Sequence, residues 1–219
     1  MSLIVYGVPL SPYVRKVRLC LAEKSLAYQL EIVLPFDQPA WFKVINPLQR
    51  IPALKDDDVV LADSSVICQY LEDKFPETLT LLGANAAQRA QVRWLEKYAD
   101  YELAPLTTFT VFSQRVLRPS MNKSTDEVAV QLALQENLPP HFDYLEQCLG
   151  DSDYFVGDSL SLADLAFACQ ITNMSYGGEC LDEQRWPKLS ALYARVKARP
   201  SLQAMLPGEQ KILASMLRK

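Results

Sequence analysis

The sequence has few of the residues on which several common kinds of active site depend. It contains one histidine, His141, and no G-x-S-x-G motif, which argues against a Ser-His-Asp hydrolase. A single histidine makes no catalytic constellation, and we interpret His141 as structural. The five cysteines include no C-x-x-C pair, so their spacing favours neither a zinc site nor a dithiol redox centre. We therefore expect no metal, and reduced cysteines that serve mainly as small buried hydrophobic residues.

Long apolar runs and an excess of positive charge are also absent. No stretch approaches the roughly 18 consecutive apolar residues of a transmembrane helix, and no basic residue precedes Pro9 as in a secretory signal. The formal net charge of −4 argues against nucleic acid or an anionic membrane as the main partner. With 49% hydrophobic and 22% charged residues, the 219-residue chain is typical of a globular cytoplasmic protein of one or two domains.

Residues 1–77 alternate between strand and helix patterns. Leu3–Tyr6 is a short apolar run typical of a buried strand, and Val14 and Val17 begin a helical apolar pattern. Tyr28–Val33 alternates apolar and polar residues, which predicts a second strand and a parallel β-α-β unit. An irregular helical segment then leads to two short strands and a helix, at Ile51–Lys55, Val59–Leu61 and Val66–Phe75. The predicted order is β-α-β-α-β-β-α.

The second part of the chain contains only helical patterns. Pro76–Asn85 is rich in turn residues, and we place a domain boundary there. Gln88–Phe112 predicts a long helix with a kink at Pro105. Two capping-box sequences, Ser124–Glu127 and Ser161–Asp164, predict the starts of later helices. The predicted domains are an α/β domain at residues 1–77 and an all-helical domain at residues 86–219.

Ser11 stands between the first strand and the first helix. A serine followed by Pro12 combines the residue types favoured at an N-cap and in the first helical turn. On its own this pattern indicates a helix cap. The positive end of a helix after a tight turn is also a suitable place to hold an anion, so a binding role stays open.

Four motifs together resemble the cytosolic glutathione transferases. They are SPYVRKVR after the first strand, NPLQRIP before the two short strands, ADSS at a helix start, and GDSLSLADLAF in the second half. Their order and spacing cover nearly the whole chain, and the absence of a cysteine near Ser11 favours a serine-type, bacterial or theta-like member. The resemblance implies a thioredoxin-like N-terminal domain that binds glutathione as co-substrate. It also implies an all-helical C-terminal domain that shapes a pocket for small hydrophobic electrophiles, and a homodimer.

The resemblance assigns roles to residues of the first domain. Ser11 matches the residue that contacts the glutathione sulfur, although Tyr6, Tyr13 or a backbone amide remain alternatives. Tyr6 belongs to the predicted strand and is interpreted as a core residue.

The other motif residues match the sites that hold the rest of glutathione. Ile51 matches the residue whose backbone pairs with the cysteinyl part, and Pro52 the cis-proline that follows it. Arg50 falls where some members place a basic side chain near the glycyl carboxylate. Asp63 and Ser64 match the pair that receives the γ-glutamyl end, although their residue types also fit a helix cap.

Aromatic residues of the second half are candidates for the electrophile pocket. A stripe runs along the long predicted helix, and such stripes belong more often to a core or an interface. The pocket candidates are Tyr101, Phe109, Phe112 and Tyr176. Asp164 matches a structural capping residue rather than a ligand.

Two functions follow from the resemblance. The first is an enzyme that conjugates the glutathione thiolate to hydrophobic electrophiles, or reduces peroxides with the same thiolate. The second is a non-catalytic binding module of the same fold within a protein complex.

Overall fold

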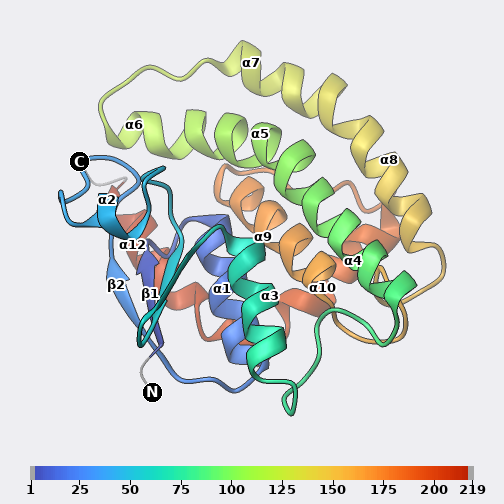
Figure 1. The fold of residues 1–219 in the computed structure, drawn as a ribbon. Helices are drawn as coiled ribbons and strands as arrows, with labels where there is room; N and C mark the ends of the chain where they lie inside the picture. Colours follow the sequence, from blue (N-terminus) through green and yellow to red (C-terminus); the bar gives the residue numbers. More distant parts are fainter. Residues whose placement is uncertain (1–2, 217–219) are drawn as a thin grey trace. The chain divides into compact units, whose positions relative to one another are not determined.

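The computed structural model describes residues 3–216. The chain divides into two compact units, Met1–Leu81 and Leu82–Lys219. Among the described residues, the four strands all belong to the N-terminal unit, and the regular elements of the C-terminal unit are all helices, as the ribbon in Figure 1 shows. This arrangement confirms the predicted fold class.

The first unit is built on a four-stranded mixed sheet. The strands lie in the order β2-β1-β3-β4, with β1 parallel to β2 and antiparallel to β3, and β4 antiparallel to β3. The strands are β1 (Leu3–Gly7), β2 (Tyr28–Ile32), β3 (Ala53–Asp56) and β4 (Val59–Ala62). The helices are α1 (Pro12–Glu23), α2 (Phe42–Ile45) and α3 (Ser64–Lys74). The order of elements is the predicted β-α-β-α-β-β-α.

The helices of this unit cover different faces of the sheet. A Cβ at Gly7 would lie 2.5 Å from Val14 Cγ2, so α1 packs closely on the face to which Gly7 belongs. Neighbouring side chains of a strand point to opposite faces, so Tyr6 points to the other one. There it forms a buried cluster with Val33, Phe42 and neighbouring residues. Helix α2 therefore packs on the face opposite to α1, and both faces of β1 are buried.

The second unit begins with one continuous helical stretch of mixed geometry. It extends beyond the predicted end at Phe112 and includes two π-helical segments that flank Pro105. Such segments accommodate a residue that breaks regular helical hydrogen bonding. The successive parts are α4 (Ala86–Tyr98), η1 (Ala99–Leu103), α5 (Ala104–Leu106), η2 (Thr107–Leu117) and α6 (Arg118–Ser120).

The most buried helix of the unit is α9 (Leu162–Tyr176), in which 13 of 15 residues are buried. This central helix contacts α4, η2 and α10. The others are α7 (Glu127–Leu132), η3 (Ala133–Asn137), α8 (Leu138–Leu149), α10 (Pro187–Lys197), α11 (Pro200–Gln203) and α12 (Leu206–Met216). Within residues 3–216, no helix has the length and apolar character needed to cross a membrane.

One of the two predicted capping boxes is present. The Ser161 side chain and Asp164 form the box that begins α9, which confirms the capping role of Asp164. The Ser124–Glu127 box is wrong. Helix α7 begins at Glu127, and Asp126 is its cap because its carboxylate accepts the Ala129 amide at 3.0 Å.

Candidate functional site

Strand register places three chain segments at one edge of the sheet. Tyr6 of β1 pairs with Ala53 of β3, and Ala53 pairs with Ala62 of β4. Because β3 is antiparallel to both neighbours, the next residue of each chain at this edge is the one after Tyr6, the one before Ala53 and the one after Ala62. The residues that border this row are Gly7, Pro52 and Asp63. The turn before α1, the proline of NPLQRIP and the start of α3 therefore lie side by side.

Ser11 is the N-cap of α1, a helix of 12 residues. Its backbone is extended, at φ −71° and ψ 125°, and its hydroxyl accepts a hydrogen bond from the Val14 amide at 3.4 Å. A hydroxyl has one donor and two acceptor positions, so this cap leaves the Ser11 proton able to bond an anion. The helix N-terminus adds a positive electrostatic potential at the same place. Capping and anion binding are compatible in one side chain.

Asn46 orders the loop that carries Arg50 and Ile51. Its side chain is buried, its Nδ2 donates to the Arg50 carbonyl at 2.7 Å, and its Oδ1 accepts the Leu48 amide at 3.0 Å. The Ile51–Pro52 peptide bond is cis, and the Arg50 side chain is exposed. Sequence reasoning did not assign Asn46 to the site, because its only signal is an Asn-Pro pair typical of a turn.

Asp63 and Ser64 form the start of α3. Asp63 adopts φ 74° and ψ 125°, and its Oδ1 accepts the Ser65 amide at 2.8 Å and the Val66 amide at 3.3 Å. A non-glycine residue at positive φ is uncommon, and such residues concentrate at ligand-binding positions. The Asp63 side chain is exposed and the Ser64 side chain is buried. An exposed carboxylate thus stands beside the N-terminus of an 11-residue helix.

Tyr6 occupies a different environment from Ser11. Its ring packs against Trp41 at 5.7 Å and Phe42 at 6.2 Å between centroids, on the α2 side of the sheet. Burial, with a smaller contribution from the charge of Glu31, raises the pKa of the Tyr6 hydroxyl above its ordinary value. This environment agrees with the interpretation of Tyr6 as a core residue.

The second unit brings together two of the four predicted pocket residues. Phe112 of η2 is buried and lies 6.4 Å from Tyr176 of α9, measured between ring centroids. Tyr101 and Phe109 are exposed, at 61% and 59% of their surface. The structure therefore provides one buried aromatic pair and two separate surface rings.

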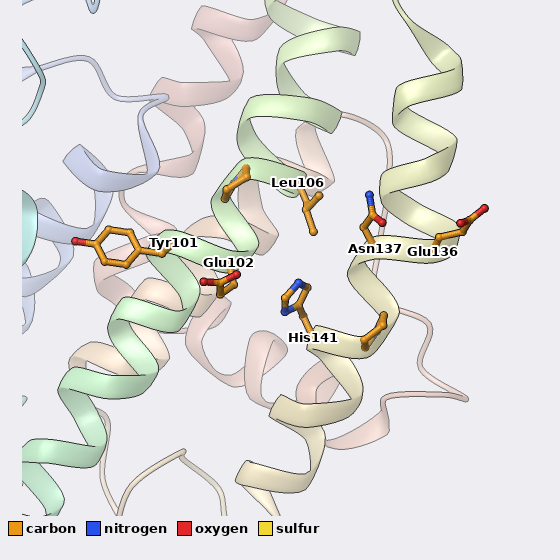
Figure 2. A pocket seen from close by; sticks show the side chains of 8 residues that line it. Tyr101, Glu102, Leu106, Glu136, Asn137 and His141 are labelled. Atoms are coloured by element: carbon orange, nitrogen blue, oxygen red, sulfur yellow. The ribbon is translucent and has the colours of Figure 1, made fainter.

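Tyr101 instead borders a shallow cavity of about 400 Å³ between the η1–α5 and η3–α8 stretches. Leu106 and His141 face each other across it, whereas the Tyr101 ring points away from His141 (Figure 2). The Tyr98 hydroxyl lies 2.7 Å from His141 Nδ1. Burial raises the pKa of Tyr98, with a smaller effect from the charge of Glu102, so this phenol keeps its proton.

Within residues 3–216, no group of three or more His, Cys, Asp or Glu side chains is placed to hold a metal ion.

Comparison with known proteins decides the family. Residues 5–79 match the family model for the N-terminal domain of glutathione S-transferase, and residues 112–207 match the model for its C-terminal domain. The chain is 32% identical to a glutathione S-transferase of Triticum aestivum over 209 residues, which cover 94% of each protein. It belongs to the glutathione S-transferase family.

Further relatives show the range of this family. The fold is similar to the crystal structure of a glutathione S-transferase from Rhodospirillum rubrum, with a TM-score of 0.84 and 32% identity over 93% of this chain and 91% of that one. The FtsZ-localized protein A of Caulobacter vibrioides is 28% identical over 92% of this chain and 90% of the relative. Glutathione is the co-substrate of the family, and the sheet edge with Ser11, Ile51 and Asp63 is therefore a candidate glutathione site.

Proposed function

We propose that this glutathione transferase conjugates the glutathione thiolate to hydrophobic electrophiles through a serine-type site at Ser11. The observation that carries this proposal is the meeting of the α1 N-terminus, the Ile51–Pro52 segment and the α3 N-terminus at one edge of the sheet. In the reaction, the sulfur forms a bond to the electrophilic carbon as the leaving group departs with its electron pair. The same thiolate would reduce a peroxide to an alcohol and water, with two glutathione molecules joined as the disulfide.

Ser11 would act on the ionisation of the glutathione thiol. A cysteine thiol has an ordinary pKa near 8.5, so only a few per cent is thiolate at about pH 7. A helix N-terminus stabilises a nearby anion by about 0.3–1 kcal/mol, and a hydrogen bond to a charged group contributes roughly 1.5–3 kcal/mol. At about 1.36 kcal/mol per pKa unit, these two effects lower the thiol pKa to near neutrality. Ser11 is then a hydrogen-bond donor to sulfur and needs no base beside it.

The rest of glutathione would bind to the neighbouring segments. The backbone of Ile51 would pair with the cysteinyl part, and the exposed Arg50 side chain would pair with the glycyl carboxylate. Asp63 can pair with the γ-glutamyl ammonium, while Ser64 and the α3 N-terminus take its carboxylate. Each charged group of glutathione would thus have either an oppositely charged side chain or a hydrogen-bond donor at a helix N-terminus as its partner.

Retention on immobilised glutathione, followed by conjugation of an aryl halide, tests the proposal. We expect Ser11→Ala to lower kcat roughly ten- to hundredfold, the loss of one hydrogen bond to a charged group, and to leave the glutathione Kd within about threefold. The matched control is Asn85→Ala, which removes another side-chain N-cap, 3.0 Å from the Gln88 amide, in the second unit. An equal loss of turnover in both variants would show that Ser11 serves only as a helix cap. Full turnover in Ser11→Ala would move the sulfur contact to Tyr6, Tyr13 or a backbone amide.

A non-catalytic binding module is the second candidate function. It is favoured by the likeness to FtsZ-localized protein A, whose name describes association with another protein. Retention on glutathione without conjugation or peroxide reduction would support this alternative. Loss of retention would contradict the glutathione site itself.

We also propose that the chain forms a homodimer, since dimerisation is typical of the family. Light scattering after size-exclusion chromatography should give twice the 24.7 kDa mass of the chain. A monomer mass at micromolar concentration would contradict this.

A further inference from the structure

Asn46 follows α2, and both its backbone and its side chain are fully engaged in hydrogen bonds. Its amide donates to the Phe42 carbonyl at 2.8 Å, and its carbonyl accepts the Gln49 amide at 2.9 Å. In its side chain, Oδ1 accepts the Leu48 amide at 3.0 Å, and Nδ2 donates to the Arg50 carbonyl at 2.7 Å. Only 2% of the Asn46 surface is exposed. One buried residue therefore holds three positions of the loop that follows it.

This loop is attached to the core of the first unit at its beginning. Phe42 is fully buried and belongs to the cluster that also contains Tyr6 and Ala53. Gln49 adopts a φ of 53°, a left-handed conformation that is uncommon outside glycine and suits a tight turn. The path of the chain after the core residue Phe42 therefore depends on the hydrogen bonds of Asn46 and not on a regular helix or strand.

The hydrogen bond to the Arg50 carbonyl also sets the direction of the Ile51 amide. The two groups belong to one planar peptide unit, and the Arg50–Ile51 bond is trans. In a trans unit the C=O and the N–H point in opposite directions, so a carbonyl held by Asn46 directs the Ile51 amide away from Asn46. Among the residues that the structure describes, the Ile51 amide and carbonyl make no hydrogen bond to another backbone group.

The contact requires a neutral amide side chain at position 46. The side chain must accept a hydrogen bond from the Leu48 amide and donate one to the Arg50 carbonyl, and an ionised carboxylate of the same size has no donor. A carbonyl that loses its donor in a partly buried position is unfavourable until it turns toward another partner or toward water. Because the peptide unit is rigid, such a rotation would turn the Ile51 amide as well.

Ile51 lies beside the turn that leads to Ser11, since its Cβ is 3.4 Å from the place that a Cβ at Gly7 would take. We propose that Asn46 is a positioning residue of the glutathione site, which aims the Ile51 amide at the cysteinyl part of glutathione. This inference rests on the proposed function, because it names the residue that prepares one of its contacts. An amide already held in the bound direction loses little freedom on binding, which favours affinity. The role adds no chemical step, and the sulfur contact of Ser11 does not depend on it.

Two variants of Asn46 and one control test this role by calorimetry with glutathione. Asn46→Ala removes both side-chain bonds, whereas Asn46→Asp keeps the acceptor for Leu48 and places a carboxylate oxygen against the Arg50 carbonyl. At about pH 7 we expect both variants to weaken the glutathione Kd about three- to tenfold, the loss of roughly one hydrogen bond, with kcat at saturating glutathione within about twofold. The matched control is Thr78→Val, which removes another side-chain bond of 2.7 Å to a carbonyl, that of Phe75, in the same unit. It should leave the Kd unchanged.

The Ile51 amide itself can be followed by NMR in protein labelled with 15N-isoleucine. The loss of one signal in Ile51→Val identifies it. In wild type, glutathione should move the Ile51 amide proton to higher frequency, as a new N–H hydrogen bond does. This shift should be smaller in Asn46→Ala and equal to wild type in Thr78→Val. A purely structural role of Asn46 would lower stability and leave the shift unchanged.

The outcomes separate this inference from the proposed function. If glutathione binds the wild-type chain without moving the Ile51 amide signal, the positioning role is overturned and conjugation through Ser11 stands. A wild-type Kd in Asn46→Asp, or an equal weakening in Thr78→Val, would overturn it too. If the wild-type chain does not bind glutathione, the proposed function falls and this inference falls with it. Should Asn46→Ala not fold, Asn46→Asp and the spectrum of the wild-type chain still decide.

Discussion

Asp63 combines three properties that a single residue seldom has. It holds a positive φ of 74°, caps α3 through two backbone amides, and keeps its side chain exposed at the sheet edge. A residue chosen only as a cap would not need the unfavourable backbone conformation. We therefore attribute its conformation to the placement of the carboxylate beside the α3 N-terminus.

Asp63→Asn separates these properties. Asparagine tolerates positive φ and caps helices as well as aspartate does, but it carries no charge. We expect the free energy of unfolding in urea to change by less than about 0.5 kcal/mol, and the glutathione Kd to weaken about tenfold through loss of the ammonium contact. Asp63→Ala is the comparison, and it should lower both stability and affinity. Wild-type affinity in Asp63→Asn would remove the carboxylate from the proposed site.

The resemblance assigned Ser11, Ile51 and Asp63 to a candidate site from short local motifs. The motifs around Ser11, Ile51 and Asp63 can be recognised from a few neighbouring residues, because each lies where a strand meets a turn or where a helix begins. Asn46 carries no comparable signal, since its role depends on a hydrogen bond to the Arg50 carbonyl that only the folded loop creates. The aromatic stripe was also insufficient, because spacing does not distinguish the buried Phe112 from the exposed Tyr101.

At the scale of elements, the start of α9 depends on a carboxylate buried among donors. Asp164 accepts the Phe155 amide at 2.9 Å and both the amide and the hydroxyl of Ser161 at 2.7 Å. Burial nevertheless raises the pKa of Asp164 from 3.8 to about 6, because desolvation outweighs these hydrogen bonds. The folded chain therefore holds this proton at pH values where the unfolded chain releases it.

This pKa makes the contribution of Asp164 to stability fall as pH rises. A group whose pKa is raised by folding contributes fully below its unfolded pKa, and the contribution is lost as pH rises through the folded value. Between pH 4.5 and pH 7 the loss is about 2 kcal/mol. Urea titrations of wild type and Asp164→Asn give the difference between their free energies of unfolding. We expect this difference, wild type minus variant, to decrease by about 2 kcal/mol between pH 4.5 and pH 7. A constant difference would contradict the raised pKa.

The two capping boxes show why element boundaries are predicted unequally well. At Ser161 the local pattern agrees with the fold, so the sequence signal is sufficient. At Ser124 tertiary contacts override it, because Thr125 Oγ1 donates to the Gln114 carbonyl and the Asp126 amide donates to Gln114 Oε1. Glu127, expected to complete the box, instead forms an ion pair with Arg115 of η2.

At the scale of the whole molecule, the order of elements was predictable and the geometry of the site was not. The sequence pattern changes along the chain from mixed strands and helices to helices alone. This change is enough to predict the fold class. The sheet order β2-β1-β3-β4 depends on which strands pair, and this order is what brings the bordering residues Gly7, Pro52 and Asp63 together. Periodicity does not encode such pairing, which explains why the resemblance was needed to connect the motifs.

The candidate glutathione site lies wholly within the first unit, and this makes binding measurable through thermal unfolding. A ligand that binds only the folded state stabilises it by RT ln(1 + [L]/Kd), about 2.7 kcal/mol at a hundredfold excess over Kd. We expect glutathione to raise the temperature of the transition in which the first unit unfolds, with about 1.4 kcal/mol more for each further tenfold in concentration. Calorimetry at increasing glutathione concentrations measures this, with Asp63→Asn as the variant whose shift should be smaller.

Ser11→Ala should show the wild-type shift in the same experiment, because it removes the hydrogen bond to the thiolate while the γ-glutamyl and cysteinyl contacts remain. Free glutathione is mostly the thiol at about pH 7, so lowering the thiol pKa to near neutrality in the complex strengthens binding only a few-fold, and the missing bond affects the reactive form more than the bound population. A shift equal to wild type combined with a large loss of kcat would place Ser11 in the chemistry of the sulfur. If glutathione shifts the transition of the wild-type chain but that chain shows no turnover, the protein would instead be a glutathione-binding module. If glutathione shifts nothing, both the enzyme and the binding module would be contradicted.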